Sequence, residues 1–357
     1  MKEAVLYEKL NDGRVRCSAC KHRCVINDGK TGICATRANI NGKLYLLTYG
    51  HPAAVNIDPI EKKPFFHVYP GSKLFSIGTF GCNFRCDFCQ NWDLSQFPKK
   101  ESMLIGEKAK VLIERNSISL EPEEAVEKAI LYGADGFAFT YNEPTIFSEY
   151  AESIAEIANR KGLFNVFVSS GYETPEALDY LKHINFFKID LKGFSDEFYR
   201  KHCGTKFEYV LETIKEIWKK RNYIEIVSLI IPGENDSDEE LRGMASFIAE
   251  LDKRIPWHIT RFHPDYLLRN KPETPIETLE KAWKIGKEEG LEYVYIGNVP
   301  GHEKESTYCP RCGNVLVERY GFYINKNVIT EDGKCPYCGY KIFGHWGRYS
   351  TRDHQNR

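Results

Sequence analysis

The sequence predicts an α/β fold: a partial (β/α)6 barrel with a small cysteine-rich module at each end. Between residue 73 and about residue 298, short apolar β-rich runs alternate with amphipathic helical patterns, as expected for βα units around a parallel barrel. Groups of cysteines with the spacing of metal ligands stand before and after this region. We therefore expect three parts, residues 1–70, 71–300 and 301–357.

Residues 1–70 are expected to form a metal-binding cap, in which residues 43–48 and 53–57 are extended. The barrel follows in residues 71–300 as six βα repeats and a last strand. Its strands are predicted at residues 74–78, 136–140, 165–169, 186–191, 223–231, 258–262 and 293–296.

Helix-start signals stand between the predicted strands. The segment 121–124, Glu-Pro-Glu-Glu, places a proline and acidic residues in a first helical turn, where they suit the unpaired N–H groups and the helix dipole. The segment 174–176, Thr-Pro-Glu, repeats this arrangement, and Ser-Asp-Glu-Glu at 237–240 is a third start.

The composition is that of a cytoplasmic enzyme without a membrane span. The formal charge of −1 does not indicate a nucleic-acid partner. No apolar run approaches the roughly 20 residues of a membrane helix, and residues 1–10 are charged rather than signal-like. All of the 12 cysteines except Cys203 fall into ligand-spaced groups, which in a reducing compartment favours metals over disulfides. Scarce glutamine beside abundant Lys and Glu suits a thermophile.

The most informative motif is Cys82-x3-Cys86-x2-Cys89, with the aromatic Phe88 before its last cysteine. Three thiolates hold three irons of a [4Fe–4S] cluster and leave the fourth iron for an external ligand. A structural zinc loop is the alternative, but it lacks a fourth ligand nearby. At this spacing, ahead of a barrel, the motif resembles that of the radical SAM superfamily. The resemblance implies S-adenosylmethionine (SAM) as the ligand and the incomplete, TIM-like barrel of these enzymes.

The segment 141–145, Tyr-Asn-Glu-Pro-Thr, follows a predicted strand where the superfamily carries Gly-Gly-Glu-Pro. The resemblance assigns Asn142 and Glu143 to the SAM site, with Glu143 accepting a hydrogen bond from the methionine ammonium. An ordinary helix N-terminus at Pro144 is compatible with this assignment.

Later strand ends are expected to complete the SAM pocket. Ser170 ends the third strand, and Asp190 and Lys192, two apart on the fourth, share one face. Resemblance to the activases of glycyl radical enzymes places Asp190, Lys192, Asn91 and His263 in the pocket. The alternatives are a structural ion pair for Asp190 and Lys192 and a packed turn for His263.

Cys203 is a candidate catalytic residue, because a thiol near a radical can donate a hydrogen atom or anchor a substrate. The alternative, which we favour, is a small buried apolar side chain.

The C-terminal cysteines have the signature of a zinc ribbon. Two Cys-x2-Cys-Gly knuckles present four thiolates, which close a tetrahedral site and leave no catalytic position. Rubredoxin-like iron has the same ligand set. We expect a zinc ion with a structural role at Cys309, Cys312, Cys335 and Cys338.

The N-terminal group also offers four thiolates, with His22 as a substitute ligand. Such a site suits zinc or a second iron–sulfur cluster, and zinc is our choice from the intervening basic residues and the long last spacer. The ligands are Cys17, Cys20, Cys24 and Cys34.

Nearly the whole chain resembles one family, the radical SAM proteins associated with Memo-like and AMMECR-like partners, formerly described as homologues of pyruvate formate-lyase activating enzyme. The matching motifs are residues 17–24, 56–64, 76–79, 140–145 and 189–194.

The resemblance implies reductive cleavage of SAM at a [4Fe–4S] cluster to a 5′-deoxyadenosyl radical, which abstracts hydrogen from a substrate that the sequence does not identify. It also implies a ferredoxin- or flavodoxin-like electron donor and Memo-like and AMMECR-like partners. One alternative is an activase that generates a glycyl radical on a partner protein. Another is a non-catalytic metal-binding scaffold, against which the intact cluster and pocket residues argue.

Overall fold

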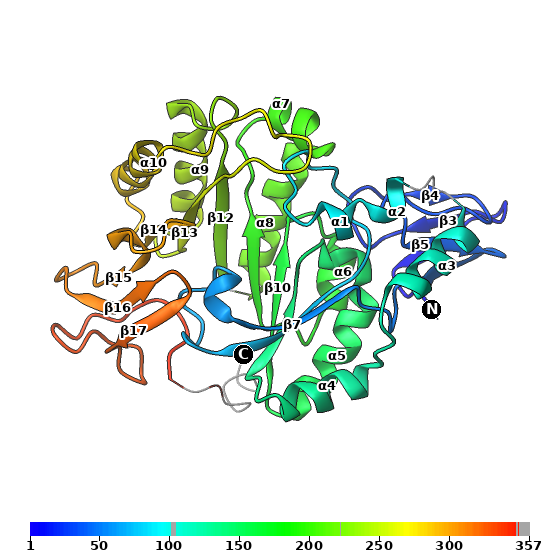
Figure 1. Cartoon of the computed structure of the whole chain (residues 1–357), viewed down its shortest axis with the longest axis horizontal. Coiled ribbons are helices and arrows are strands. Elements are labelled where there is room, and N and C mark those ends of the chain that lie inside the picture. Colours follow the sequence, from blue (N-terminus) through cyan, green and yellow to red (C-terminus); the bar gives the residue numbers. More distant parts are fainter. Residues whose placement is uncertain (101–104, 222, 348, 350–357) are drawn as a thin grey trace.

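The computed structural model describes residues 1–100, 105–221, 223–347 and 349. A large central sheet carries helices on one side, and a small β-rich module lies at each end of the molecule (Figure 1). Within the described residues, no helix is both long enough and apolar enough to cross a bilayer.

The central sheet has eight strands in the order β14-β13-β12-β11-β10-β9-β8-β7. Strands β8 to β14 are parallel, and β7 pairs antiparallel with β8. Its two edge strands, β7 and β14, are not paired with each other, so the barrel is open. This confirms the predicted α/β fold with a partial barrel. The strands are β7 (Ala54–Pro59), β8 (Lys73–Gly78), β9 (Gly136–Phe139), β10 (Phe164–Ser169), β11 (Phe186–Asp190), β12 (Ile224–Ile230), β13 (Trp257–Arg261) and β14 (Val294–Gly297).

The parallel strands are buried on both faces, which is why they are near-continuous apolar runs. Phenylalanines of neighbouring strands pack in a row. Successive ring centroids are 5.4 to 6.4 Å apart, in the order Phe75, Phe137, Phe139, Phe167 and Phe187. This row forms part of the core beneath the functional end of the sheet.

The helices begin where the sequence predicts. Thr174 accepts a hydrogen bond from the backbone N–H of Ala177, Ser237 accepts one from that of Glu240, and Pro122 is the first residue of α4. In Figure 1, α8 lies behind the sheet, and α4, α5 and α6 lie towards its lower right. The α-helices are α1 (Trp92–Ser95), α2 (Phe97–Lys100), α3 (Gly106–Asn116), α4 (Pro122–Leu131), α5 (Ser148–Arg160), α6 (Pro175–Tyr180), α7 (Asp196–Phe198), α8 (Phe207–Arg221), α9 (Asp238–Leu251) and α10 (Ile276–Glu288). The remaining helical turns are η1 (Ile60–Lys62), η2 (Pro144–Phe147), η3 (Tyr199–Cys203) and η4 (Glu303–Glu305).

The N-terminal module consists of two three-stranded sheets, β1-β6-β5 and β2-β3-β4. The buried guanidinium of Arg37 attaches it to the barrel, because it pairs with the carboxylate of Glu149 and donates to the carbonyl of Ile146. Strand β7 lies within residues 1–70 but belongs to the central sheet, so the sheet begins before residue 71. The strands are β1 (Lys2–Glu3), β2 (Tyr7–Lys9), β3 (Val15–Cys17), β4 (Val25–Ile26), β5 (Arg37–Ile40) and β6 (Lys43–Leu46).

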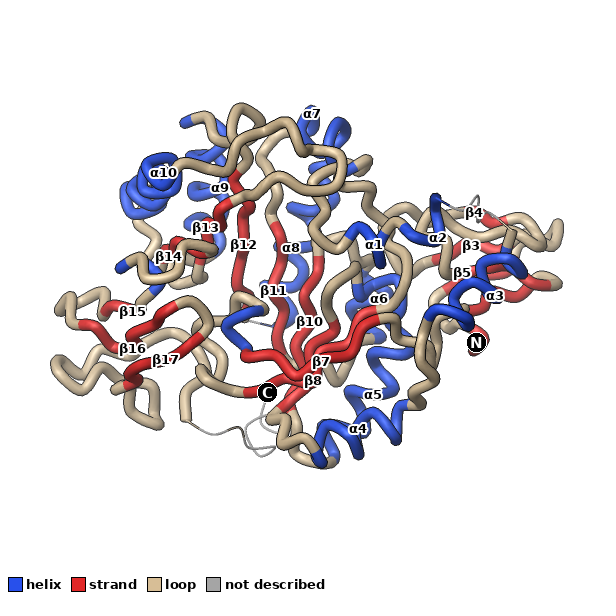
Figure 2. The backbone as a smooth tube through the Cα atoms, in the orientation of Figure 1, coloured by secondary structure: helices blue, strands red, loops and turns tan. Residues whose placement is uncertain are grey.

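The C-terminal module is the three-stranded sheet β15 (Thr307–Tyr308), β16 (Val315–Tyr320) and β17 (Tyr323–Asn327) beside β13 and β14 (Figure 2). Its interior is not independent of the barrel. Leu316 and Val317 share one apolar cluster with Phe66, Tyr293 and Tyr295.

Candidate active site

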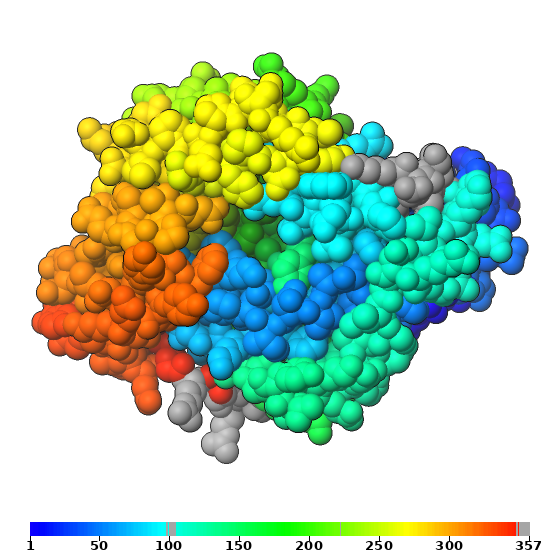
Figure 3. All heavy atoms as spheres, viewed as in Figure 1, coloured from blue at the N-terminus to red at the C-terminus, as the bar shows by residue number. Residues whose placement is uncertain are grey.

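A cavity of about 480 Å³ opens at the carboxyl ends of the parallel strands. Figure 3 shows it as the hollow at the centre of the face in view, between the segments coloured blue, cyan and orange-yellow. This is the end at which barrels of parallel strands place their functional groups. The sequence-predicted residues that line it are Cys82, Cys86, Phe88, Cys89, Asn91, Asn142, Glu143, Ser170, Asp190 and Lys192.

The three cysteines of the loop after β8 stand on one wall of this cavity. Cys82 accepts a hydrogen bond from the backbone N–H of Phe84 at 3.4 Å, and the Cys89 thiol lies 3.2 Å from the Ser95 hydroxyl. Burial raises the pKa of Cys82 to about 12, so this thiol is neutral until a metal displaces its proton. Buried thiols that face one open space fit the ligands of an iron–sulfur cluster, and the donor set is the one such clusters use.

Asn142 fastens the cysteine loop to the end of β9. Its amide donates to the carbonyl of Gly81 at 2.8 Å and accepts from the backbone N–H of Thr79 at 3.0 Å. Asn91, just after the loop, donates to the carbonyl of Tyr141 at 2.8 Å. Both asparagines therefore line the cavity and also fix the position of its cysteine wall.

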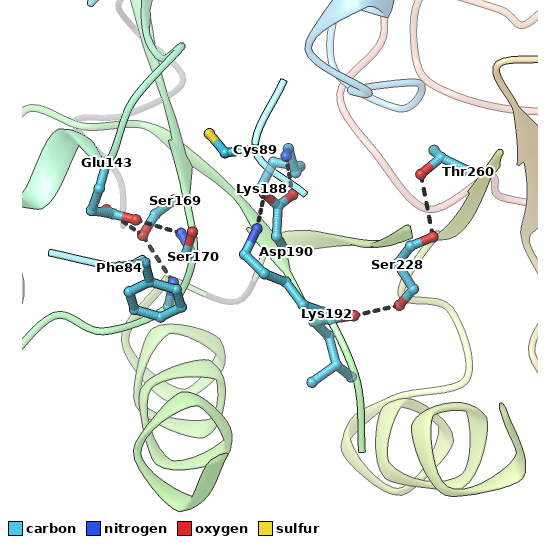
Figure 4. Close-up of polar contacts among 12 residues, drawn as sticks. Phe84, Cys89, Glu143, Ser169, Ser170, Lys188, Asp190, Lys192, Ser228 and Thr260 are labelled. Carbon is cyan, nitrogen blue, oxygen red and sulfur yellow. Dashed lines mark hydrogen bonds and ion pairs between the residues drawn. The ribbon is translucent and has the colours of Figure 1, made fainter. Parts of the chain in front are cut away.

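The Glu143 carboxylate is buried and joins β9 to β10. It accepts hydrogen bonds from the Ser169 hydroxyl at 2.8 Å, the Ser170 backbone N–H at 2.7 Å and the Thr145 hydroxyl at 2.7 Å (Figure 4). The structure thus gives Glu143 a second task, because it orients the Ser170 segment at the cavity. Its assignment to a methionine ammonium stays a prediction.

Asp190 lies between two lysines at the end of β11 (Figure 4). Its carboxylate pairs with Lys188 and accepts from Lys192 at 2.9 Å. Burial alone would raise the pKa of Asp190, but the two ammonium charges lower it to about 2. Sequence reasoning missed Lys188, although its place two residues before Asp190 on the strand puts it on the same face.

A second pair of lysines, Lys62 and Lys63, reaches the cavity from the turn after β7. Asp58 holds both, at 2.8 and 2.7 Å, and also accepts from the Tyr141 hydroxyl at 2.5 Å. The sequence showed these residues only as a family motif without a role. Four ammonium groups therefore face a cavity that contains few carboxylates, which suits a ligand that carries anionic groups.

Two predicted residues do not line the cavity. His263 is exposed, and its Nε2 lies 2.8 Å from the side-chain nitrogen of Gln90, which itself lines the cavity. Cys203 is fully buried within the core, and its thiol lies within hydrogen-bond reach of Cys86. The structure thus places Cys203 behind a predicted cluster ligand rather than in the space open to a substrate.

An apolar pocket of about 270 Å³ adjoins the cavity. The two share Pro64, Thr260, Asn298 and Phe322 in their walls. Strand β14 contributes one side of the pocket and the β16–β17 hairpin another, so the C-terminal module reaches the edge of the candidate active site.

The four C-terminal cysteines form a compact group in which all sulfurs lie within 4.8 Å of one another. The Cys309 and Cys338 sulfurs are 3.6 Å apart, and those of Cys312 and Cys335 are 3.7 Å apart. A tetrahedron with metal–sulfur bonds of about 2.3 Å has sulfurs about 3.8 Å apart. The predicted four-thiolate site is therefore present, and it fits a single ion.

Comparisons with known proteins agree with this geometry. The sequence model of the Radical SAM superfamily matches residues 76–248, which contain the three cysteines, Glu143, Asp190 and Lys192. This chain belongs to the radical SAM superfamily.

Individual proteins are also similar to this chain. The chain is 46% identical over 346 residues to the uncharacterized protein MJ0808 of Methanocaldococcus jannaschii, which covers 96% of this chain and 99% of that one. It is 24% identical over 228 residues to the pyruvate formate-lyase-activating enzyme of Clostridium pasteurianum, with 58% of this chain and 87% of that one covered. A solved radical SAM methyltransferase from Sphaerobacter thermophilus matches with a TM-score of 0.47 and 14% identity, over 64% of this chain and 68% of that one.

Proposed function

We propose that this protein cleaves SAM reductively and uses the resulting 5′-deoxyadenosyl radical to abstract hydrogen from a substrate. The observation that carries the proposal is one cavity that is lined by the three cysteines of the cluster loop and by paired charges at the strand ends. A [4Fe–4S] cluster bound there supplies the electron that breaks the sulfonium–carbon bond of SAM.

The residues of the chain have separate tasks in this proposal. Cys82, Cys86 and Cys89 hold three irons, and Asn142 keeps their loop against β9. Asp190 keeps Lys188 and Lys192 charged and fixed, which prepares the cavity for the polar groups of SAM before it binds.

The adjoining apolar pocket supports a place for the substrate, because it meets the cavity at Thr260 and Phe322. The surface that its walls expose is mostly apolar and includes Phe66, Ile296 and Val299. We propose a substrate with an apolar body that presents a C–H bond at this junction.

A second candidate is an activase that abstracts hydrogen from a glycine of a partner protein. The observation that favours it is the likeness to proteins named as activating enzymes, such as that of Clostridium pasteurianum. The same cavity serves both candidates. A glycyl radical signal in electron paramagnetic resonance (EPR), formed on a glycyl radical enzyme encoded next to this chain, would favour the activase. If no glycyl radical enzyme is encoded next to this chain, radical chemistry performed directly on a substrate of this enzyme would be favoured.

Finer proposals rest on the sequence motifs. The motifs at 17–24 and 56–64 support membership of the Memo- and AMMECR-associated branch, and with it Memo-like and AMMECR-like partners and a ferredoxin- or flavodoxin-like electron donor. A pure metal-binding scaffold would not need the paired charges that line the cavity.

The test is product analysis on anaerobically reconstituted protein with dithionite and SAM. We expect methionine and 5′-deoxyadenosine, slowly even without substrate, and neither from a variant with alanine at Cys82, Cys86 and Cys89. A matched control with alanine at Cys309 and Cys312 removes two thiols of the C-terminal group, which do not line the cavity, and should retain cleavage. Methylthioadenosine as the sole product of the wild type would overturn the proposal, because a different SAM bond would then break.

A further inference from the structure

The N-terminal cysteines gather around a second, smaller cavity. Cys17, at the end of β3, and Cys20, Cys24 and Cys34 from the following loops all line one small space. Arg37 and Ile146 close it on the barrel side. Sequence positions spread over 18 residues thus converge on one apolar space.

The spacing of these sulfurs differs from that of the C-terminal group. Among the described residues, the C-terminal four are the one set of three or more ligands whose atoms all lie within 4.8 Å of one another. No three of the N-terminal sulfurs meet this criterion, nor do Cys82, Cys86 and Cys89.

A single tetrahedral ion requires sulfurs about 3.8 Å apart, whereas thiolates on different irons of a cubane are about 6 Å apart, because the iron core separates them. Neither the N-terminal sulfurs nor those of the cluster loop are therefore gathered as closely as a single tetrahedral ion requires, in contrast to the zinc-ribbon site of the same chain.

The small cavity lies directly against the cluster loop. Gly81, the residue before Cys82, is so close to Cys34 that a Cβ on it would stand 2.4 Å from the Cys34 carbonyl oxygen. His22, inside the N-terminal motif, donates from Nε2 to the carbonyl of Asn83 at 3.0 Å. Because this nitrogen is engaged, it is not available as a metal ligand. The main chain of the cluster loop at residues 81–83 thus contacts the N-terminal cysteine segment at Cys34 and at His22.

We propose that Cys17, Cys20, Cys24 and Cys34 hold a second [4Fe–4S] cluster, which carries single electrons next to the active site. Four protein thiolates leave this cluster no open iron, so it transfers an electron and no atom. It would accept one electron from a ferredoxin- or flavodoxin-class donor, or from dithionite in vitro, and give up one electron. This inference goes beyond the proposed function, because it concerns a different set of ligands.

The first test counts metals in anaerobically reconstituted protein. We expect about eight irons and eight sulfides for each wild-type chain, and one zinc at the C-terminal site. The variant with alanine at Cys82, Cys86 and Cys89 should keep about four irons and four sulfides. After reduction it should show a cluster EPR signal that SAM does not change. Two zinc ions and no iron in this variant would overturn the inference.

The second test uses the reciprocal variant, Cys20→Ala with Cys24→Ala. It should lose four of the eight irons, and the remaining signal should still respond to SAM. The control, Cys309→Ala with Cys312→Ala, should lose zinc and keep all the iron. If the reciprocal variant does not fold, the inference is tested by the iron count of the wild type and by that of the variant with alanine at Cys82, Cys86 and Cys89. Failure of the proposed function would appear separately, as a wild-type protein whose spectrum does not respond to SAM.

Discussion

Asp190→Asn is the substitution whose effect the structure quantifies best. The change keeps the shape of the side chain but removes the one carboxylate that pairs with Lys188 and Lys192. The ordinary pKa of this group is 3.8, and the two lysines lower it to about 2 against the opposing effect of burial. A shift of this size corresponds to about 2 kcal/mol of folding stability.

The pH dependence follows from the direction of the shift. A carboxylate whose pKa is lower in the folded state stabilises the protein above pH of about 4, and this contribution disappears as the pH falls towards 2. The variant lacks it at every pH. We therefore expect its thermal midpoint to be about 4 °C below that of the wild type at pH 7, if the barrel unfolds as one unit, and the difference to shrink below pH 4.

The control is Glu156→Gln, which breaks an exposed pair on α5 in which Arg160 lies 2.6 Å from Glu156. Such pairs contribute about 0.5 kcal/mol or less, so its midpoint should stay within about 1 °C of the wild type. Scanning calorimetry of the three proteins at several pH values gives the comparison. An Asp190→Asn midpoint equal to that of the control, or a difference that does not change with pH, would refute the reasoning.

Three further variants test other parts of the site. Glu143→Ala should weaken SAM binding about 10- to 150-fold in equilibrium titration, because a charge-assisted hydrogen bond and the anchor of Ser170 are lost. An unchanged affinity for SAM would show that Glu143 is not part of the SAM site. Replacing Cys335 and Cys338 with alanine should lower the thermal midpoint while SAM cleavage per cluster stays near that of the wild type, since a closed metal site supplies folding energy; loss of cleavage would contradict a structural role. Gly81→Ala should reduce the iron content of the reconstituted protein, because Gly81 has a φ of +86° and no room for a Cβ. A variant that retains all of its iron would count against the tight contact between Gly81 and the N-terminal module.

The order and boundaries of the barrel strands could be predicted from the sequence, because each parallel strand is buried on both faces and must be apolar along its length. The helix starts at residues 122, 175 and 238 followed from local capping chemistry. The antiparallel strand β7 was assigned to the cap instead. Its pairing with β8 depends on a contact between distant segments that no local pattern reveals.

The sequence predicted those residues of the site that belong to recognisable motifs. Cysteine spacing and strand-end charges identified the ligand loop and Asp190, but not the turn that brings Lys62 and Lys63 to the cavity. His263 was assigned from resemblance alone, and the structure places it one contact away, behind Gln90. The closeness of the N-terminal cysteines to the cluster loop could not be foreseen either, because it depends on how the module packs on the barrel.

The most direct test of the central claim is the EPR spectrum of the dithionite-reduced protein before and after SAM is added. An external ligand on the open iron changes the electronic environment of the cluster. The account predicts that SAM shifts the signal of the wild type, and that the shift is absent when Cys82, Cys86 and Cys89 are all replaced by alanine. A wild-type signal that SAM leaves unchanged, or a SAM-dependent shift that persists in the triple variant, would contradict it.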